Sequence, residues 1–344
     1  MKIKVRLLLT ASGLLLLLAV GIIVWIYGVF YRPNVLDGQS RHIYLYEEDD
    51  FDSLLQQLKD KNLLRDERSF KKAADYYDYP RQMHSGHYVL EAGMNNKRAL
   101  QILRLGLQQP VRIRFHNLRK VEQLAGLLSK QVMADSLSLL EIFYDRVWLD
   151  SLGLTAETLP ALFIPDTYEV WWNSSPEKLM QLFSRSYRQF WNEERRAKAE
   201  ALGLSPVEVS VLASIIEEES NVKDEWPVIA GLYLNRLRRG MYLQACPTVK
   251  FALNDFSIQR VLTEHTEVVS PYNTYLHLGL PPGPIRIPQK SSLLAVLDAE
   301  KHNYLYMCAK DDFSGRHYFS SSLAEHNRYA QKYHRALNQR RILK

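Results

Sequence analysis

The sequence has few cysteines to cross-link the fold and lacks the common short motifs that identify a function. Its 344 residues include only two cysteines, Cys246 and Cys308. Two cysteines cannot form a disulfide framework, and this pair is too widely spaced to be a close metal or redox motif. A single bridge between them stays open at this stage. No His-Glu-x-x-His, Gly-x-Ser-x-Gly or P-loop pattern occurs, so the motifs of zinc proteases, α/β-hydrolases and P-loop nucleotide-binding proteins are missing.

The sequence also lacks a concentration of charge. The formal net charge is +6, charged residues make up 24% and hydrophobic residues 47%, which is ordinary for a folded protein. The basic residues are spread along the chain, with no basic helix, RNA-binding aromatic motif or zinc-finger spacing. We therefore expect a solvated basic surface and no nucleic-acid partner. The length favours two or three domains.

One long hydrophobic run is present, from Leu7 to Tyr31. It exceeds the roughly 20 residues that a helix needs to cross a bilayer. Basic residues come before it (Lys2, Lys4 and Arg6), and aromatic residues gather at its far end (Trp25, Tyr27 and Tyr31). This pattern predicts a cytoplasmic tail at 1–6, a transmembrane helix at 7–31 and an extracytoplasmic bulk. A cleaved signal peptide is the alternative, but its apolar core would be shorter and no small-x-small site follows.

The next part of the chain predicts a small α+β module. A short linker is expected at 32–40, before strands at 42–46 and 86–91 that are rich in strand formers. Amphipathic helices are expected at 51–61, 67–77 and 96–106. Together they form a unit of about 70 residues.

The remainder is mostly helical, with short strands. Ser205, Pro206 and Glu208 form a helix start of the capping-box type. We expect strands at 111–115, 304–309 and 316–319, helices at 118–132, 176–201, 207–219, 224–239 and 289–300, a basic helix at the C-terminus, and a rigid proline-rich loop at 279–284.

Three consecutive glutamates end the helix that begins near Val207. At about 100° per residue, Glu219 projects onto the centre of the apolar face, whereas Glu217 joins a polar stripe with Ser210 and Ser214. Glu218 lies at the border. Burial and the negative end of the helix dipole should both raise the pKa of Glu219, while its two neighbours are expected to be solvated. The alternative is that all three belong to a frayed, charged helix end.

The histidines give a weaker signal. His317 and His326 are close in sequence, but a metal site needs three or four convergent ligands. We therefore interpret them as core or surface residues and expect no metal ion and no cofactor.

Several ordered motifs resemble those of the YceG-like endolytic murein transglycosylases. They cover nearly the whole chain: Gly86–Tyr88, Ile164–Tyr168, Ala213–Ser220, Val228–Leu237, Gly240–Gln244, Pro247–Val249, Pro271–Tyr275, Gly279–Gly283, Ile287–Pro288, His317–Phe319 and Glu325–Asn327. The resemblance implies a LysM-like module at 32–110, a catalytic domain at 111–344, and cleavage within peptidoglycan glycan strands that leaves 1,6-anhydro-N-acetylmuramic ends. It also implies a bacterial inner-membrane location and proximity to peptidoglycan synthases.

The family's catalytic glutamate precedes a Ser or Thr, and that position here is Glu219, followed by Ser220. A single carboxyl group suits this reaction, because the muramic C6 hydroxyl supplies the nucleophile, whereas ordinary glycosidases need two carboxylates. The family usually has Asp before Pro-Thr-Val, but this chain has Cys246, which argues against a catalytic role for that carboxylate.

Amide and aromatic side chains near these motifs are candidate sugar contacts. They are Asn235, Gln244, Tyr272, Asn273 and Tyr275. Helix packing is the alternative for Asn235 and core packing for the tyrosines. Two other functions also stay open: a lysozyme-like hydrolase, and a peptidoglycan-binding scaffold without activity.

Overall fold

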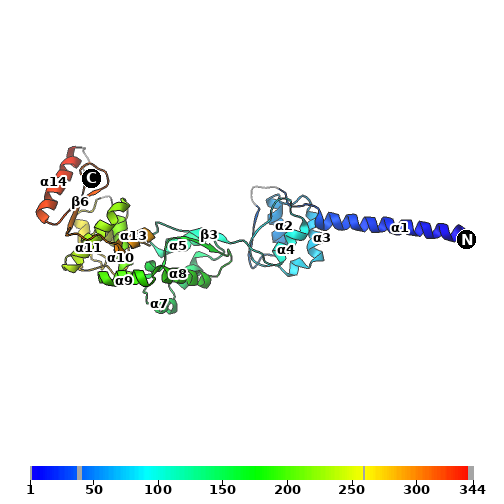
Figure 1. The fold of residues 1–344 in the computed structure, drawn as a ribbon, viewed down its shortest axis with the longest axis horizontal. Coiled ribbons are helices and arrows are strands. Elements are labelled where there is room, and N and C mark those ends of the chain that lie inside the picture. Colours follow the sequence, from blue (N-terminus) through cyan, green and yellow to red (C-terminus); the bar gives the residue numbers. More distant parts are fainter. Residues whose placement is uncertain (1, 37–40, 259, 340–344) are drawn as a thin grey trace. The chain divides into compact units, whose positions relative to one another are not determined.

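The computed structural model describes residues 2–36, 41–258 and 260–339 (Figure 1). It divides into two compact units. Unit 1 runs to Ile113 and includes residues 131–133 and 169–174; unit 2 holds residues 114–130, 134–168 and the chain from Ser175 onward. The expected α+β class, with one apolar N-terminal helix, many further helices and short strands, is confirmed.

The apolar N-terminal segment forms helix α1, Lys2–Ile26, which continues into a π-helical turn, Tyr27–Tyr31. Within it, Leu9–Tyr31 has a mean hydropathy of 2.6 and is long enough to cross a membrane. Its leucine and isoleucine side chains from Leu9 to Ile26 are exposed. An exposed apolar helix of this length fits a membrane anchor.

The end of this segment packs into unit 1. Val29 and Phe30 are buried, and the Phe30 ring meets Tyr76 and Tyr77 edge-on at 5.0 and 5.7 Å. The expected linker is wrong for the described residues 32–36, because Asn34 and Val35 are buried. Asn34 Nδ2 donates to Asn96 Oδ1 at 2.7 Å. The rest of that expectation, 37–40, lies outside the described residues.

The other predicted elements of unit 1 are present. Strands β1 (His42–Leu45) and β2 (Gly86–Val89) pair antiparallel, and the helices are α2 (Phe51–Asp60), α3 (Glu67–Tyr76) and α4 (Asn96–Arg104). Each of these helices begins with an Asp or Asn whose side chain accepts a backbone N–H of the first turn, the usual N-cap chemistry.

Strands β3 (Val111–Arg114) and β4 (Thr167–Val170) form a second two-stranded sheet. The boundary between the two units falls within both strands. The pairing partner of β3 was not predicted, since four residues with one charged position give little strand signal.

Unit 2 is predominantly helical. Its helices are α5 (Val121–Leu128), α6 (Ser136–Phe143), α7 (Arg146–Leu152), α8 (Pro176–Phe190), α9 (Glu193–Leu202), α10 (Pro206–Glu219), α11 (Trp226–Arg238), α12 (Cys246–Leu253), α13 (Lys290–Leu297) and α14 (Leu323–Gln339). Strands β5 (Tyr306–Ala309) and β6 (His317–Ser320) form an antiparallel hairpin. The single helix expected at 176–201 is two helices, because Asn192 caps α9 by accepting from Arg195 N.

Helix α10 lies in the core of unit 2 and carries the glutamates. The predicted capping box is confirmed: Glu208 N donates to Ser205 Oγ at 3.2 Å and Ser205 N to Glu208 Oε2 at 2.7 Å. All residues from Val209 to Glu217 are buried. A helix buried on every side has no solvent-facing stripe, so its polar residues need partners within the protein.

Candidate active site

The three glutamates at the end of α10 have different environments. Glu217 is buried, which contradicts the expectation that it is solvated. Its carboxylate lies 3.0 Å from Arg286 Nη2 and accepts from Gln289 N at 2.9 Å and Ser292 Oγ at 2.8 Å. The polar stripe of α10 faces polar partners from residues 285–292 rather than water. Ser214 on the same stripe likewise accepts from Ile285 N at 3.0 Å.

Glu218 is also not a free surface group. Its side chain is 17% exposed and pairs with Arg286 Nη1 at 2.7 Å and Arg119 Nη2 at 3.0 Å. Both carboxylates therefore have guanidinium partners, and they share that of Arg286. The expected solvation is wrong for both residues.

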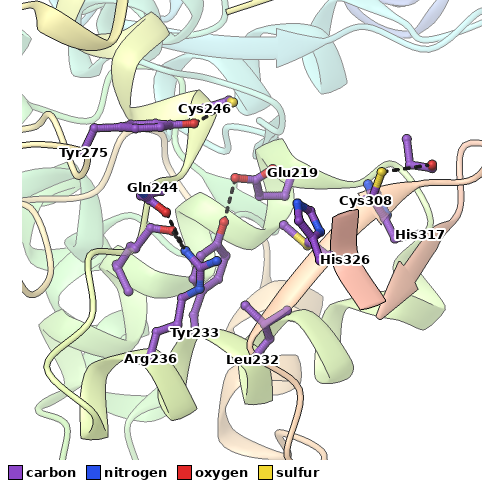
Figure 2. A pocket seen from close by; sticks show the side chains of 13 residues that line it. Glu219, Leu232, Tyr233, Arg236, Gln244, Cys246, Tyr275, Cys308, His317 and His326 are labelled. Carbon is purple, nitrogen blue, oxygen red and sulfur yellow. Dashed lines mark hydrogen bonds between the residues drawn. The ribbon is translucent and has the colours of Figure 1, made fainter. Parts of the chain in front are cut away.

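Glu219 faces a cavity of about 340 Å³ (Figure 2). The cavity is built from α10, α11, the start of α12, the hairpin, α14 and two connecting segments. Its lining residues are Glu219, Leu232, Tyr233, Arg236, Leu243, Gln244, Cys246, Tyr275, Met307, Cys308, Ala309, His317 and His326. Glu219 is the only carboxylate among these described residues.

The carboxyl group of Glu219 is desolvated, and none of the described residues forms an ion pair with it. Burial raises its pKa to about 7, although the hydrogen bond from Tyr233 and the charges of Lys250 and Arg236 act in the opposite direction. Tyr233 Oη donates to Glu219 Oε1 at 2.7 Å, the contact drawn in Figure 2. A carboxyl group with this pKa is protonated in part of the population near neutral pH and can act as a general acid.

Two of the five predicted sugar contacts, Gln244 and Tyr275, lie at this cavity. Gln244 has a left-handed backbone, with φ of 52°, and its N donates to Thr274 O at 3.1 Å. Tyr275 Oη lies 3.3 Å from Cys246 Sγ. The strained backbone of Gln244 directs its amide to the cavity, where Figure 2 shows it above Arg236.

The other three do not line the cavity; the two asparagines have backbone hydrogen-bond partners and the tyrosine packs on another ring. Asn235 Nδ2 donates to His302 O at 2.7 Å and Tyr304 O at 3.1 Å. Asn273 is fully buried, and its Nδ2 donates to two loop carbonyls at 2.9 and 2.8 Å. The Tyr272 ring packs on Phe251 at 4.7 Å. The contacts of Asn235 and Tyr272 agree with the packing alternative given for them.

Sequence reasoning missed Tyr233 and Arg236 as cavity residues. Arg236 is buried, and its guanidinium donates to Leu305 O at 2.6 Å and Leu243 O at 2.8 Å. Tyr233 and Arg236 are three residues apart on α11 and so share one face of that helix. Both lie in the motif Val228–Leu237 that contains Asn235. Because α11 presents Tyr233 and Arg236 to Glu219, Asn235 faces the other way.

The two cysteines are free thiols, and both line the cavity. Burial raises the pKa of each thiol. Within residues 2–36, 41–258 and 260–339, no group of three or more His, Cys, Asp or Glu converges as a metal ion would require. His317 and His326 do lie at one cavity (Figure 2).

A known protein family matches most of this chain. The YceG-like family model matches residues 43–332. An endolytic murein transglycosylase of Bacillus subtilis is 42% identical over 129 residues, 38% of this chain and 35% of that protein. One from Streptococcus pneumoniae is 30% identical over 125 residues, 35% of this chain and 22% of that protein. The matched part thus spans about a third or less of these relatives.

A solved structure is also similar. The crystal structure of a YceG-like protein from Listeria monocytogenes aligns with a TM-score of 0.56 and 26% identity. The alignment covers 83% of this chain and 97% of that one, so the resemblance extends over both units.

Proposed function

This chain belongs to the YceG-like family, and we propose that it is an endolytic peptidoglycan lytic transglycosylase, a carbon–oxygen lyase with Glu219 as its catalytic residue. The observation that carries the proposal is the isolated Glu219 carboxyl group, with a pKa raised to about 7, at the cavity of unit 2. The relatives named as murein transglycosylases support the same reaction class.

In the proposed reaction the protonated Glu219 donates its proton to the oxygen between N-acetylmuramic acid and N-acetylglucosamine. The muramic C6 hydroxyl attacks C1 of the same sugar, and a base accepts the proton of that hydroxyl. The product is a 1,6-anhydro-muramic end. In its simplest form Glu219 is acid and base in turn, because a carboxyl group that has given up its proton can accept another.

A lone carboxylate favours this route over hydrolysis. Hydrolytic glycosidases use two carboxyl groups on either side of the bond, and Glu219 has no second one among the described cavity residues. Cys246 stands where a second carboxylate would lie in related sequences, and burial keeps its thiol protonated, since burial raises the thiol pKa. Gln244 and Tyr275 are proposed to contact the sugars.

We further propose the location and the domain roles. Leu9–Tyr31 would anchor the chain in the inner membrane once, with residues 1–6 in the cytoplasm and residues 32–344 outside. Residues 32–110 would be a LysM-like module for glycan strands, and residues 111–344 the catalytic domain. The basic residues before the apolar run support this orientation. Endolytic cleavage there would end the elongation of nascent strands beside the synthases.

The test is product analysis with the full chain in detergent. Purified peptidoglycan is digested with the wild type, Glu219→Gln and the matched control Glu200→Gln, whose exposed side chain lies on α9. The products are identified by mass spectrometry. We expect internal anhydro-muramic ends from the wild type and the control, and a loss of at least about 1,000-fold for Glu219→Gln, because Gln cannot donate the proton.

Two other outcomes identify the alternatives. Reducing muramic ends in place of anhydro ends mean a lysozyme-like hydrolase. Full complementation of a deletion strain by Glu219→Gln, with glycan binding intact, means a scaffold without catalysis.

A further inference from the structure

A second polar residue at the cavity is held by a buried carboxylate. Glu225 ends the 3-10 turn Lys223–Glu225, and its side chain is 7% exposed. Glu225 Oε2 lies 2.8 Å from His317 Nδ1, and Glu225 Oε1 accepts from His317 N at 2.9 Å. Ser220 Oγ donates to Oε2 at 3.3 Å. Both oxygens of Glu225 are therefore committed to holding His317 and the end of α10.

This arrangement fixes the state of the imidazole. A carboxylate beside Nδ1 selects the tautomer that carries its proton on Nδ1, which leaves Nε2 as an acceptor. His317 lines the cavity, and Figure 2 places it across the cavity from Tyr233, on the hairpin side. Because Ser220 directly follows Glu219, the same carboxylate ties together the two elements that carry Glu219 and His317.

We propose that His317 is a second catalytic residue, whose Nε2 accepts the proton of the muramic C6 hydroxyl while Glu219 protonates the leaving oxygen. Glu225 is its positioning residue. The inference rests on the proposed transglycosylase function and replaces the version in which Glu219 performs both transfers. A hydrogen-bonded carboxylate behind a histidine base is a recurring solution for orienting the ring and stabilising its protonated form.

The step balances without a co-reactant. The bond between C1 and the glycosidic oxygen breaks with its electron pair on that oxygen, which takes the proton from Glu219. The C6 oxygen forms the new bond to C1 and releases its proton to His317 Nε2. The cavity then holds a carboxylate and an imidazolium, and a proton passing from His317 to Glu219 through water restores both groups.

Other charged and titratable groups line the same cavity as His317. They are Glu219 on α10, Arg236 on α11, Cys308 on β5 and His326 on α14. The exposed ion pair of Asp224 and Arg316 joins the residues next to Glu225 and His317 in the chain. Burial raises the pKa of the Cys246 and Cys308 thiols. Burial, together with the charge of Arg236, lowers the pKa of His326. Of the two histidines that line the cavity in the described residues, His317 has the carboxylate partner that orients its ring as a general base requires.

The experiment compares pH–rate profiles of His317→Gln, Glu225→Gln and His302→Gln in the full chain. The His302 ring also bonds two backbone groups, Val228 O at 2.9 Å and Tyr304 N at 3.0 Å, but lies outside the cavity. It controls for loss of structure. We expect kcat/KM to fall about 100-fold or more for His317→Gln, with the loss of the decline on the acidic side. The kcat/KM of Glu225→Gln should fall less, and its acidic decline should shift. His302→Gln should be less stable but should keep the pH–rate profile of the wild type.

A second measurement covers poor folding of these variants. Added imidazole should restore part of the activity of His317→Gly and none of that of Glu219→Gln. The inference is overturned if His317→Gln loses less than about threefold, keeps the acidic decline, or is matched by His302→Gln. An active Glu219→Gln or hydrolytic products would overturn the proposed function instead, whatever His317→Gln does.

Discussion

Glu217 and Glu219 stand two residues apart on one helix and have opposite electrostatic environments. Glu217 is buried with a guanidinium, a backbone N–H and a hydroxyl around its carboxylate. Glu219 faces a cavity with one hydroxyl donor and a pKa raised to about 7. Burial alone therefore does not decide the state of a carboxyl group; its partners do. The first residue joins elements of the fold, and the second is left free for chemistry.

Removing Arg286, the cation that pairs with Glu217, should have the largest effect on stability. Arg286→Met leaves Glu217 and Glu218 without their shared guanidinium, whose side chain is 6% exposed. We expect the free energy of unfolding to fall by about 3–5 kcal/mol, measured by urea denaturation. The control is Arg112→Met, from an exposed pair with Glu169, which should change it by less than about 1 kcal/mol. Equal effects would mean that the buried cluster is not structural.

Removing the charge of Glu219 should have the opposite sign. Its pKa is about 7 in the folded chain and near 4.5 when unfolded, so the folded state binds the extra proton between these values and stability falls as pH rises through that window. Glu219→Gln abolishes this loss. We expect the variant to gain about 2–3 kcal/mol over the wild type at pH 8 and little at pH 4.

Thermal melts at the two pH values measure this gain. A variant that is no more stable than the wild type at pH 8 would show that Glu219 is fully solvated in the folded chain. The activity loss described above should accompany the gain, as expected for a residue whose placement serves chemistry at the cost of stability.

Replacing Glu217 with Gln should lower stability, in contrast to the same change at Glu219. Glu217→Gln should cost about 2 kcal/mol, since Gln keeps the shape but weakens the bonds to Arg286 and to Gln289 N. Its kcat at a temperature where the variant is folded should stay within about threefold of the wild type. Measurements of the rate of product formation at 15 and 37 °C would separate a loss of folded protein from a loss of catalysis. A large loss of kcat at both would give Glu217 a catalytic role instead.

The smallest expected effect tests the partner of Glu219. Tyr233→Phe removes the hydroxyl that donates to Glu219 Oε1, and this hydrogen bond lowers the pKa of Glu219. The pKa should therefore rise further, and the decline of kcat/KM on the alkaline side should move to higher pH by up to about one unit. A profile that is unchanged or moved to lower pH would contradict this arrangement.

Local patterns in the sequence predicted much of the fold. The capping box at Ser205, the alternating strands and the long apolar run each depend on residues close together in the chain, so periodicity and capping suffice to find them. The break between α8 and α9 was missed although Asn192 is a good cap, because the charged residues on either side continue the helical pattern. The packing of residues 29–36 into unit 1 was missed, since it depends on partners as distant as Asn96.

The helical wheel placed Glu219 on the apolar side of α10, but it wrongly placed Glu217 and Glu218 in water. A wheel orders residues around one helix and says nothing of what surrounds it. Here residues 285–292 supply polar partners to the side expected to face solvent. The sequence likewise did not show that Asn235 faces the carbonyls of His302 and Tyr304 while Arg236 lines the cavity, because those partners are distant along the chain.

By itself the sequence determined the apolar N-terminal helix, the start and end of α10 and the singling out of Glu219, because these depend on composition and local spacing. Only the tertiary structure decided which polar groups meet. The pairing of Glu217 with Arg286 joins residues 69 positions apart, and that of Glu225 with His317 joins residues 92 positions apart. Such contacts depend on how helices and strands pack, and the desolvation that sets a carboxyl pKa exists only after they have packed.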